Sequence, residues 1–193
     1  MSTIQKIMII LKHRANSIES FDKRYGAEID VRDFDNELVI SHDLPNENSL
    51  KLESFIQKIP KETFLAINVK SSEIEHNLKE IINKYNIKNY FTFDHSVPSL
   101  VKSIKCNLSC AFRLSEYEKE IIPNCNWVWV DCFENIWYDQ NFLKSLKDLQ
   151  LKIALVSPEL HGRKSEIKKF EDVVNSVLVD AICTDTPEYW DND

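Results

Sequence analysis

Glycine is nearly absent from this chain of 193 residues, which contains only Gly26 and Gly162. Average usage of about 7% would give roughly a dozen. A glycine-rich phosphate-binding turn, such as dinucleotide-binding folds use, is therefore excluded. We expect the two glycines that remain to lie where the backbone needs a positive φ or a close approach to its neighbours.

Paired cysteine motifs and long apolar runs are missing as well. The five cysteines, at 106, 110, 125, 132 and 183, have irregular spacing and no CxxC pair, so the sequence does not indicate a zinc site. We interpret them as reduced thiols, mostly on buried strands, in a cytoplasmic protein. The apolar run at 7–11 is too short for a signal-peptide core or a membrane span.

A dense block of basic residues is the third absence. The chain has 24 Lys and Arg against 31 Asp and Glu, a net charge of −7, which argues against binding to nucleic acid or to anionic lipid. A hydrophobic content of 43% can supply a proper core. The length predicts one domain over 1–193. The oligomeric state stays open.

Strand-like and helix-like segments alternate along the chain. Apolar runs rich in β-branched and aromatic residues predict strands at 6–12, 27–32, 37–42, 63–70, 89–93, 108–114, 127–133, 152–157 and 181–184. Amphipathic spacing predicts helices at 17–25, 71–86, 97–105, 138–150 and 164–178. Asn16 is the expected N-cap of the first helix.

The strand at 37–42 interrupts the alternation. Only four residues, with the turn-forming sequence DFDN, separate it from its predecessor, so we expect a hairpin. The remaining eight strands and about seven helices fit an α/β fold, a compact (β/α)8 TIM barrel with a short β-hairpin insertion after strand 2. A doubly wound open sheet is the alternative, but its phosphate-binding turn is normally glycine-rich.

Two acids stand out on the second expected strand. Glu28 and Asp30 are two residues apart, so both point to one side of the strand. Two carboxylates in a small space repel unless a cation lies between them, and hard oxygen ligands favour Mg²⁺ or Ca²⁺. The alternative is that both are solvated or salt-bridged to Arg14 or Arg32.

Histidines and cations lie at other strand ends. His13 and His42 are candidates for general acid and base, or are simply hydrogen-bonded at their strand ends. Arg14 and Lys70 suit an anion such as phosphate, or are surface charges.

Three further regions are weaker candidates. His161, in the loop SPELHGR, either lines a substrate pocket or belongs to a helix entry. Asp94, Arg113 and Asp131 are candidates to line a pocket only. The aromatic cluster at 126–138 is mostly core, with its last residues available to stack on a substrate ring.

These motifs resemble the glycerophosphodiester phosphodiesterase family, within the phospholipase C-like phosphodiesterases. The resemblance is carried by HRANS (His13, Arg14, Asn16), GAEIDV (Gly26, Glu28, Asp30), LVISHD (His42, Asp43), INVK (Lys70) and CTDTPE (Thr184, Asp185, Pro187). It implies a TIM barrel that cleaves phosphodiesters with one divalent cation.

The same resemblance implies roles for single residues. His13 and His42 would be the general acid and base, Glu28 and Asp30 the metal carboxylates, and Arg14 and Lys70 the phosphate ligands. Asn68 stands where the family has a third metal carboxylate, and Ala15 where it has a glycine. An amide oxygen can bind a hard cation but carries no charge, so we expect weaker metal affinity or a shifted ion preference.

The sequence thus predicts a metal-dependent phosphodiesterase, with Mg²⁺ or Ca²⁺, that hydrolyses a small glycerophosphodiester-like substrate or a phosphoglycerol-bearing saccharide. Two alternatives stay open. One is a catalytically impaired barrel that binds a phosphorylated ligand without turnover. The other is a metal-free lyase that uses the histidine pair to form a cyclic phosphate.

Overall fold

The computed structural model describes residues 8–176 and 179–191, which form ten strands and five α-helices. The strands are β1 (Ile9–Lys12), β2 (Gly26–Phe34), β3 (Glu37–Ile40), β4 (Leu50–Lys51), β5 (Leu65–Val69), β6 (Tyr90–Phe93), β7 (Ala111–Leu114), β8 (Trp127–Val130), β9 (Lys152–Val156) and β10 (Ala181–Thr184). The helices are α1 (Leu52–Ile56), α2 (Glu75–Lys84), α3 (Val97–Lys105), α4 (Gln140–Asp148) and α5 (Ile167–Ser176).

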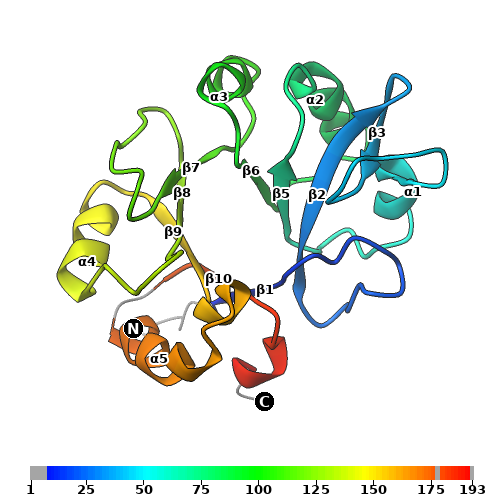
Figure 1. Cartoon of the computed structure of the whole chain (residues 1–193). Helices are drawn as coiled ribbons and strands as arrows, with labels where there is room; N and C mark the ends of the chain where they lie inside the picture. The colour runs from blue at the N-terminus through cyan, green and yellow to red at the C-terminus, as the bar shows by residue number, and fades with distance from the viewer. Residues whose placement is uncertain (1–7, 177–178, 192–193) are drawn as a thin grey trace, which may run out of the picture.

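Eight of the strands form a closed parallel barrel, seen end-on in Figure 1. One run of parallel ladders joins β1, β2, β5 and β6, and the other joins β1, β10, β9, β8 and β7. A single parallel bridge between Thr92 and Cys110 closes the ring between β6 and β7. The expected TIM barrel is therefore confirmed. The expected hairpin is also present, because β3 pairs antiparallel with β2 and β4 extends it.

Strand alternation sorts the core into two layers. Residues of one parity, such as Ala27, Ile29 and Val31 on β2, pack outward in the large apolar cluster. Residues of the other parity fill the barrel, where large aromatic side chains face small ones. The inner cluster contains Phe91, Phe93, Trp127 and Trp129 together with Ala66, Ala111, Ala154 and Ala181. The Phe93 and Trp129 rings stack at 4.0 Å between centroids, close to the carboxyl end of the barrel.

Four of the five expected helices are present. The helix expected at 97–105 coincides with α3, whose N-cap Ser96 accepts a hydrogen bond from the backbone N–H of Ser99. The other three are shorter than expected: α2 for 71–86, α4 for 138–150, and for 164–178 a 3₁₀ turn at Lys164–Glu166 followed by α5. Positions 6 and 7 of the first expected strand and 177–178 lie outside the described residues.

The helix expected at 17–25 is wrong, because this segment consists of turns. Ser17 and Ser20 exchange hydrogen bonds between side chain and backbone, which offers the chain an alternative to helical pairing. Asn16 caps nothing, since its amide binds Asp30. With α1 not foreseen and no helix between β7 and β8, the described chain has five α-helices rather than about seven.

The two glycines lie where the backbone needs them. A Cβ at Gly26 would come within 2.8 Å of Leu11 Cδ2 and 3.0 Å of the Phe64 carbonyl oxygen. Gly162 ends the 3₁₀ helix Pro158–His161 with a φ of +76°. All five cysteines are free thiols, and Cys110, Cys132 and Cys183 are buried. Among the described residues, every helix is too short or too polar to cross a membrane.

Candidate active site

The candidate site lies at the carboxyl end of the barrel strands and begins with two buried acids on β2. Because Ala27, Ile29 and Val31 pack outward, Glu28 and Asp30 face the barrel interior. Each is only 1% exposed. The prediction that the two acids share one side is therefore confirmed, and the alternative of solvated strand residues is wrong.

Glu28 is gripped by the backbone that follows β1. The Arg14 N–H donates to Glu28 Oε2 at 2.8 Å, and the Ala15 N–H donates to the Glu28 carbonyl oxygen at 2.8 Å. Arg14 has a φ of +48°, a left-handed conformation that is strained for a residue with a Cβ. Burial, together with the negative charge of Asp30, raises the pKa of Glu28 to about 8.

Asp30 has partners on both carboxylate oxygens. Lys70 Nζ lies 3.3 Å from Oδ1, and Asn16 Nδ2 donates to Oδ2 at 2.7 Å. Asn16 Oδ1 also accepts the Asp30 backbone N–H at 2.9 Å, so one amide fixes both ends of this residue. On the neighbouring β5, Asn68 pairs with Asp30 in the ladder, and its buried Oδ1 has no hydrogen-bond partner among the residues that the structure describes.

The two histidines reach the same end of the barrel from β1 and the hairpin. His13 Nδ1 lies 2.8 Å from Asp185 Oδ1, just beyond β10. His42 Nε2 lies 2.7 Å from Arg14 Nη2, and its Nδ1 lies 2.9 Å from Asp43 Oδ1. Because a guanidinium can only donate, His42 Nε2 is the acceptor and Nδ1 carries the hydrogen that Asp43 accepts.

The opposite wall carries a second polar network. The Arg113 guanidinium bonds Asp94, at the end of β6, and Asp131, at the end of β8. His161 Nε2 lies 2.7 Å from Asp131 Oδ1, and its ring is 5.0 Å from that of Phe133. Burial alone would raise the pKa of Asp131, but His161 and Arg113 bring it below its ordinary value.

The predicted site residues therefore fall into two groups. Arg14 joins Glu28 to His42, and Asp30, on the same strand as Glu28, is paired with Asn68 and Lys70. His13 precedes Arg14 in the chain, and its side chain contacts Asp185. The described contacts of His161 join it to Asp131 and Phe133, in the network of Arg113. From the sequence we predicted that all these residues lie at one end of the barrel. The structure shows in addition that they belong to two separate networks on different walls.

The donor set of the first group suits one hard divalent cation. Glu28 and Asp30 supply buried carboxylate oxygens, and the unpartnered Asn68 Oδ1 supplies a neutral one. No group of three or more His, Cys, Asp and Glu side chains with metal-binding geometry occurs among residues 8–176 and 179–191. A cation held between Glu28, Asp30 and Asn68 would have the amide as its third protein ligand, and such a set carries one charge less than three carboxylates.

Sequence reasoning missed the roles of three supporting residues. Asn16 was expected to cap a helix and instead holds Asp30. Arg32 donates to the His42 carbonyl oxygen at 3.0 Å and lies 3.5 Å from the Lys70 carbonyl oxygen, so it ties the hairpin to β5. Glu159, only 4% exposed, accepts hydrogen bonds from Ser157, Thr184 and the Asp185 N–H. Its position in SPELHGR, shortly after the apolar strand β9, is the sequence signal that could have identified it.

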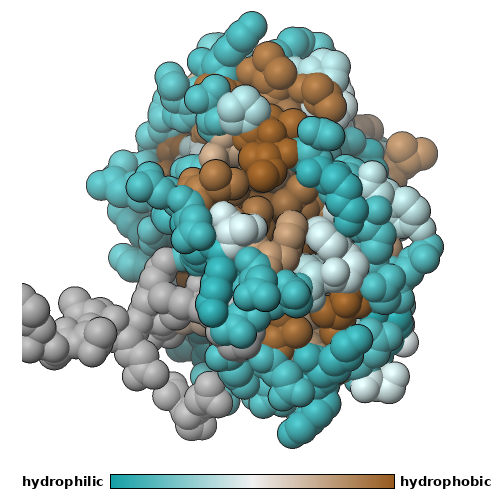
Figure 2. Space-filling model, turned by 90° about the vertical axis from the view of Figure 1, so that its left-hand side faces the viewer, coloured by the Kyte–Doolittle hydropathy of each residue, from teal (hydrophilic) through white to brown (hydrophobic). Residues whose placement is uncertain are grey.

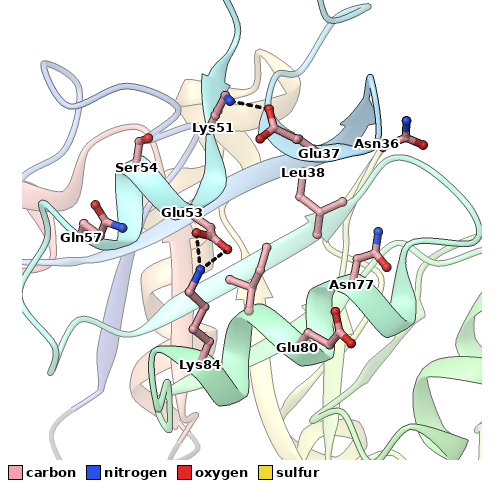
Figure 3. Close-up of a pocket in the computed structure, with 11 residues that line it drawn as sticks. Asn36, Glu37, Leu38, Lys51, Glu53, Ser54, Gln57, Asn77, Glu80 and Lys84 are labelled. Atoms are coloured by element: carbon pink, nitrogen blue, oxygen red, sulfur yellow. Dashed lines mark hydrogen bonds and ion pairs between the residues drawn. The ribbon is translucent and has the colours of Figure 1, made fainter.

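A pocket on the outer side of the barrel is separate from this site. It lies between the β2–β3 hairpin, α1 and α2, and Figure 3 shows its wall of polar side chains. Its lysines are neutralised by Glu37 and Glu53, which pair with Lys51 and Lys84. It shares no lining residue with the candidate site, so we assign it no part in the chemistry.

Fold and site together define a TIM barrel whose acids, histidines and cations gather at the carboxyl ends of the strands. No protein-family model matches the sequence, and no curated protein matches it. Solved structures do share the fold, among them two glycerophosphodiester phosphodiesterases and one further phosphodiesterase.

The enzyme from Thermotoga maritima has a TM-score of 0.74 at 18% identity over 95% of this chain and 97% of its own. That from Agrobacterium tumefaciens has a TM-score of 0.72 at 12% identity, over 94% and 98%. A phosphodiesterase from Oleispira antarctica, solved with its product sn-glycerol-3-phosphate, has a TM-score of 0.68 at 15% identity, over 94% of each chain. The chain therefore has the fold of these enzymes.

Proposed function

We propose that this protein hydrolyses a glycerophosphodiester-like substrate with one divalent cation and a pair of histidines. The observation that carries the proposal is the joining of His42 to the loop that binds Glu28. Arg14 contacts His42 through its guanidinium and Glu28 through its backbone N–H. One histidine, one cation and one of the two buried acids are thus joined by direct contacts. The likeness in fold to phosphodiesterases supports the same conclusion.

The tautomers suit the two histidines for different tasks. His42 Nε2 already acts as an acceptor, with Asp43 holding the hydrogen on Nδ1, so it fits the base that takes a proton from the attacking hydroxyl. His13 lies against Asp185, whose carboxylate stabilises an imidazolium, so it fits the acid that protonates the leaving alkoxide. Their side chains are 39% and 20% exposed, which leaves both open to a substrate.

The charged residues position the phosphate. Arg14 and Lys70 reach the mouth from β1 and β5 and are suited to bind its non-bridging oxygens. Glu28, Asp30 and Asn68 would hold a divalent cation, Mg²⁺ or Ca²⁺, which when bound withdraws charge from the phosphoryl oxygens. Lys70 Nζ also lies 3.3 Å from Asp30 Oδ1 and so contributes to the charge balance of the acids.

The experiment is a turnover assay with glycerophosphocholine and with a chromogenic phosphodiester, in Mg²⁺, Ca²⁺ or Mn²⁺ and in chelator. We expect His13→Ala and His42→Ala each to lower kcat by about 10²- to 10⁴-fold. His76→Ala is the matched control, because His76 is 79% exposed on the outer helix α2 and pairs only with Glu80 in the described structure.

The products separate the remaining possibilities. Release of glycerol phosphate that requires a metal supports hydrolysis as proposed. Equal rates in wild type and both histidine variants would refute the mechanism. A cyclic phosphate formed in chelator would indicate the metal-free lyase, and tight phosphodiester binding without turnover in any metal would indicate an impaired barrel.

A further inference from the structure

A groove with an apolar floor leads away from the candidate site between α3 and the segment 115–122. At its inner end lie Lys70 and Arg113, which face the barrel mouth. Its floor contains Leu100 and Phe112, which are 6% and 2% exposed. Its volume of about 780 Å³ is within the range of small-molecule sites. The groove exists because the segment between β7 and β8 forms no helix that would pack against α3.

The walls of this groove expose apolar side chains to solvent. On α3, Val97 is 70% exposed, and across the groove Tyr117 is 68% exposed, next to the charged residues Glu118, Lys119 and Glu120. Val97 and Tyr117 are two of the eight large hydrophobic side chains that the described surface exposes. Figure 2 shows hydrophobic residues gathered in a hollow on the side of the molecule that carries these segments, between hydrophilic rims.

The segment 115–122 is held in place, so the groove is formed before any ligand binds. The Ser115 side chain accepts the N–H groups of Tyr117 and Glu118 at 3.2 and 3.1 Å. The Glu116 carboxylate accepts three backbone N–H groups from residues 133–135, at 3.0 to 3.1 Å. A pre-formed apolar surface binds a ligand without the entropic cost of ordering a loop.

We propose that this groove binds an aliphatic chain of the substrate, so that the preferred phosphodiester is an amphiphile with one chain of roughly eight or more carbons. This rests on the proposed function, because the phosphate of the same molecule lies at Lys70. The order of the side chains supports the assignment: Lys70 lies at the inner end, next to the candidate site, and the exposed apolar side chains of Val97 and Tyr117 lie farther along the groove. The chain is attached either to the glycerol or to the second alcohol, and the test separates these two.

The first measurement is binding and does not need turnover. Ethyl phosphate and decyl phosphate, kept below micellar concentrations, are titrated into the protein by calorimetry. Burying a methylene group favours binding by at most about fourfold, so eight additional methylenes in an open groove should tighten Kd by at least about tenfold. Equal Kd values for the two phosphates would overturn the proposal.

Two variants locate the effect. Val97→Glu and Tyr117→Ser alter exposed walls, so the fold is retained, and both should lose most of the gain from chain length. Leu149→Glu is the matched control, since Leu149 is 55% exposed at the end of α4, outside the groove. An undiminished gain in both wall variants would also overturn the proposal.

Turnover measurements then show which alcohol of the substrate carries the aliphatic chain. A monoacyl glycerophosphodiester and a glycerophosphate ester of decanol are compared with glycerophosphocholine, and the preferred one should have a lower KM that rises in Val97→Glu. If none is hydrolysed in any metal, the proposed function fails while the binding series still decides about the groove. If all three are hydrolysed with equal KM, and the wall variants leave these KM values unchanged, the proposed function is supported and the groove proposal is refuted.

Discussion

Replacing Glu28 with glutamine should stabilise the metal-free protein at alkaline pH while it removes activity. The carboxyl group is 1% exposed, faces Asp30 inside the barrel and has a pKa of about 8 against an ordinary value of 4.5. The fold therefore favours the protonated form. The stability that this group contributes is fully present below pH 4.5 and is lost as the pH rises through 8.

The size of the effect follows from the same pair of values. At about 1.4 kcal/mol for each pKa unit, the interval from 4.5 to 8 corresponds to about 5 kcal/mol as an upper limit. Glutamine keeps an oxygen that can accept the Arg14 N–H and never ionises, so Glu28→Gln escapes this cost. The unfolding free energy of the variant, relative to wild type, should rise steadily between pH 4.5 and 8 and then level off.

The assay is urea unfolding in chelator at pH 5, 7 and 9, followed by tryptophan fluorescence. Glu188→Gln, at an exposed position, is the control and should show no such trend. Added Mg²⁺ or Ca²⁺ should stabilise the wild type more than Glu28→Gln, because the cation replaces the proton on the buried acid. A difference between variant and wild type that does not change with pH would refute the reasoning.

Three further outcomes follow from other residues. Asn68→Asp adds a third carboxylate and should tighten divalent cation binding by at least about tenfold in calorimetry; unchanged affinity would mean that Asn68 does not face the ion. His95 is held neutral by burial, with a pKa of about 4 against 6.5. Its stabilisation of about 3 kcal/mol is present above pH 6.5 and lost as the pH falls toward 4, and His95→Gln should flatten this decline in urea unfolding. Gly26→Ala should cost about 1–3 kcal/mol, because the new Cβ meets Leu11 Cδ2 and the Phe64 carbonyl oxygen at 2.8 and 3.0 Å; an unchanged urea midpoint would contradict it.

The barrel was predictable because strand-like and helix-like segments alternate regularly along the sequence. Alternation placed Glu28 and Asp30 on one side of β2, and the rule that parallel strands end at one edge brought His13, His42 and Lys70 to the same region. Short-range chemistry sufficed for the hairpin, although only Asp35 and Asn36 of DFDN form the turn, both with positive φ, because β2 continues through Phe34. These features depend on residues close in sequence or on a symmetry of the fold.

What could not be predicted depends on contacts between distant residues. His13 pairs with Asp185, 172 positions away, and nothing near either residue indicates it. The prediction of a helix at 17–25 was wrong because the side chains of Ser17 and Ser20 hydrogen-bond the backbone N–H groups of this segment, and because the Asn16 side chain hydrogen-bonds Asp30 instead of capping a helix. The groove beside α3 is equally non-local, since it arises where a helix is missing from the neighbouring unit.

The departures from ordinary protein chemistry converge on the barrel mouth. Arg14 and Asp94 both adopt positive φ at the ends of barrel strands, Glu28 is a buried acid beside another, and Asn68 Oδ1 is a buried oxygen without a partner. Each is unfavourable in a metal-free fold, by about 1–3 kcal/mol for strain or for an unpaired polar atom. A single bound cation would relieve the last two at once, because it attracts both carboxylates and accepts the free amide oxygen as a ligand.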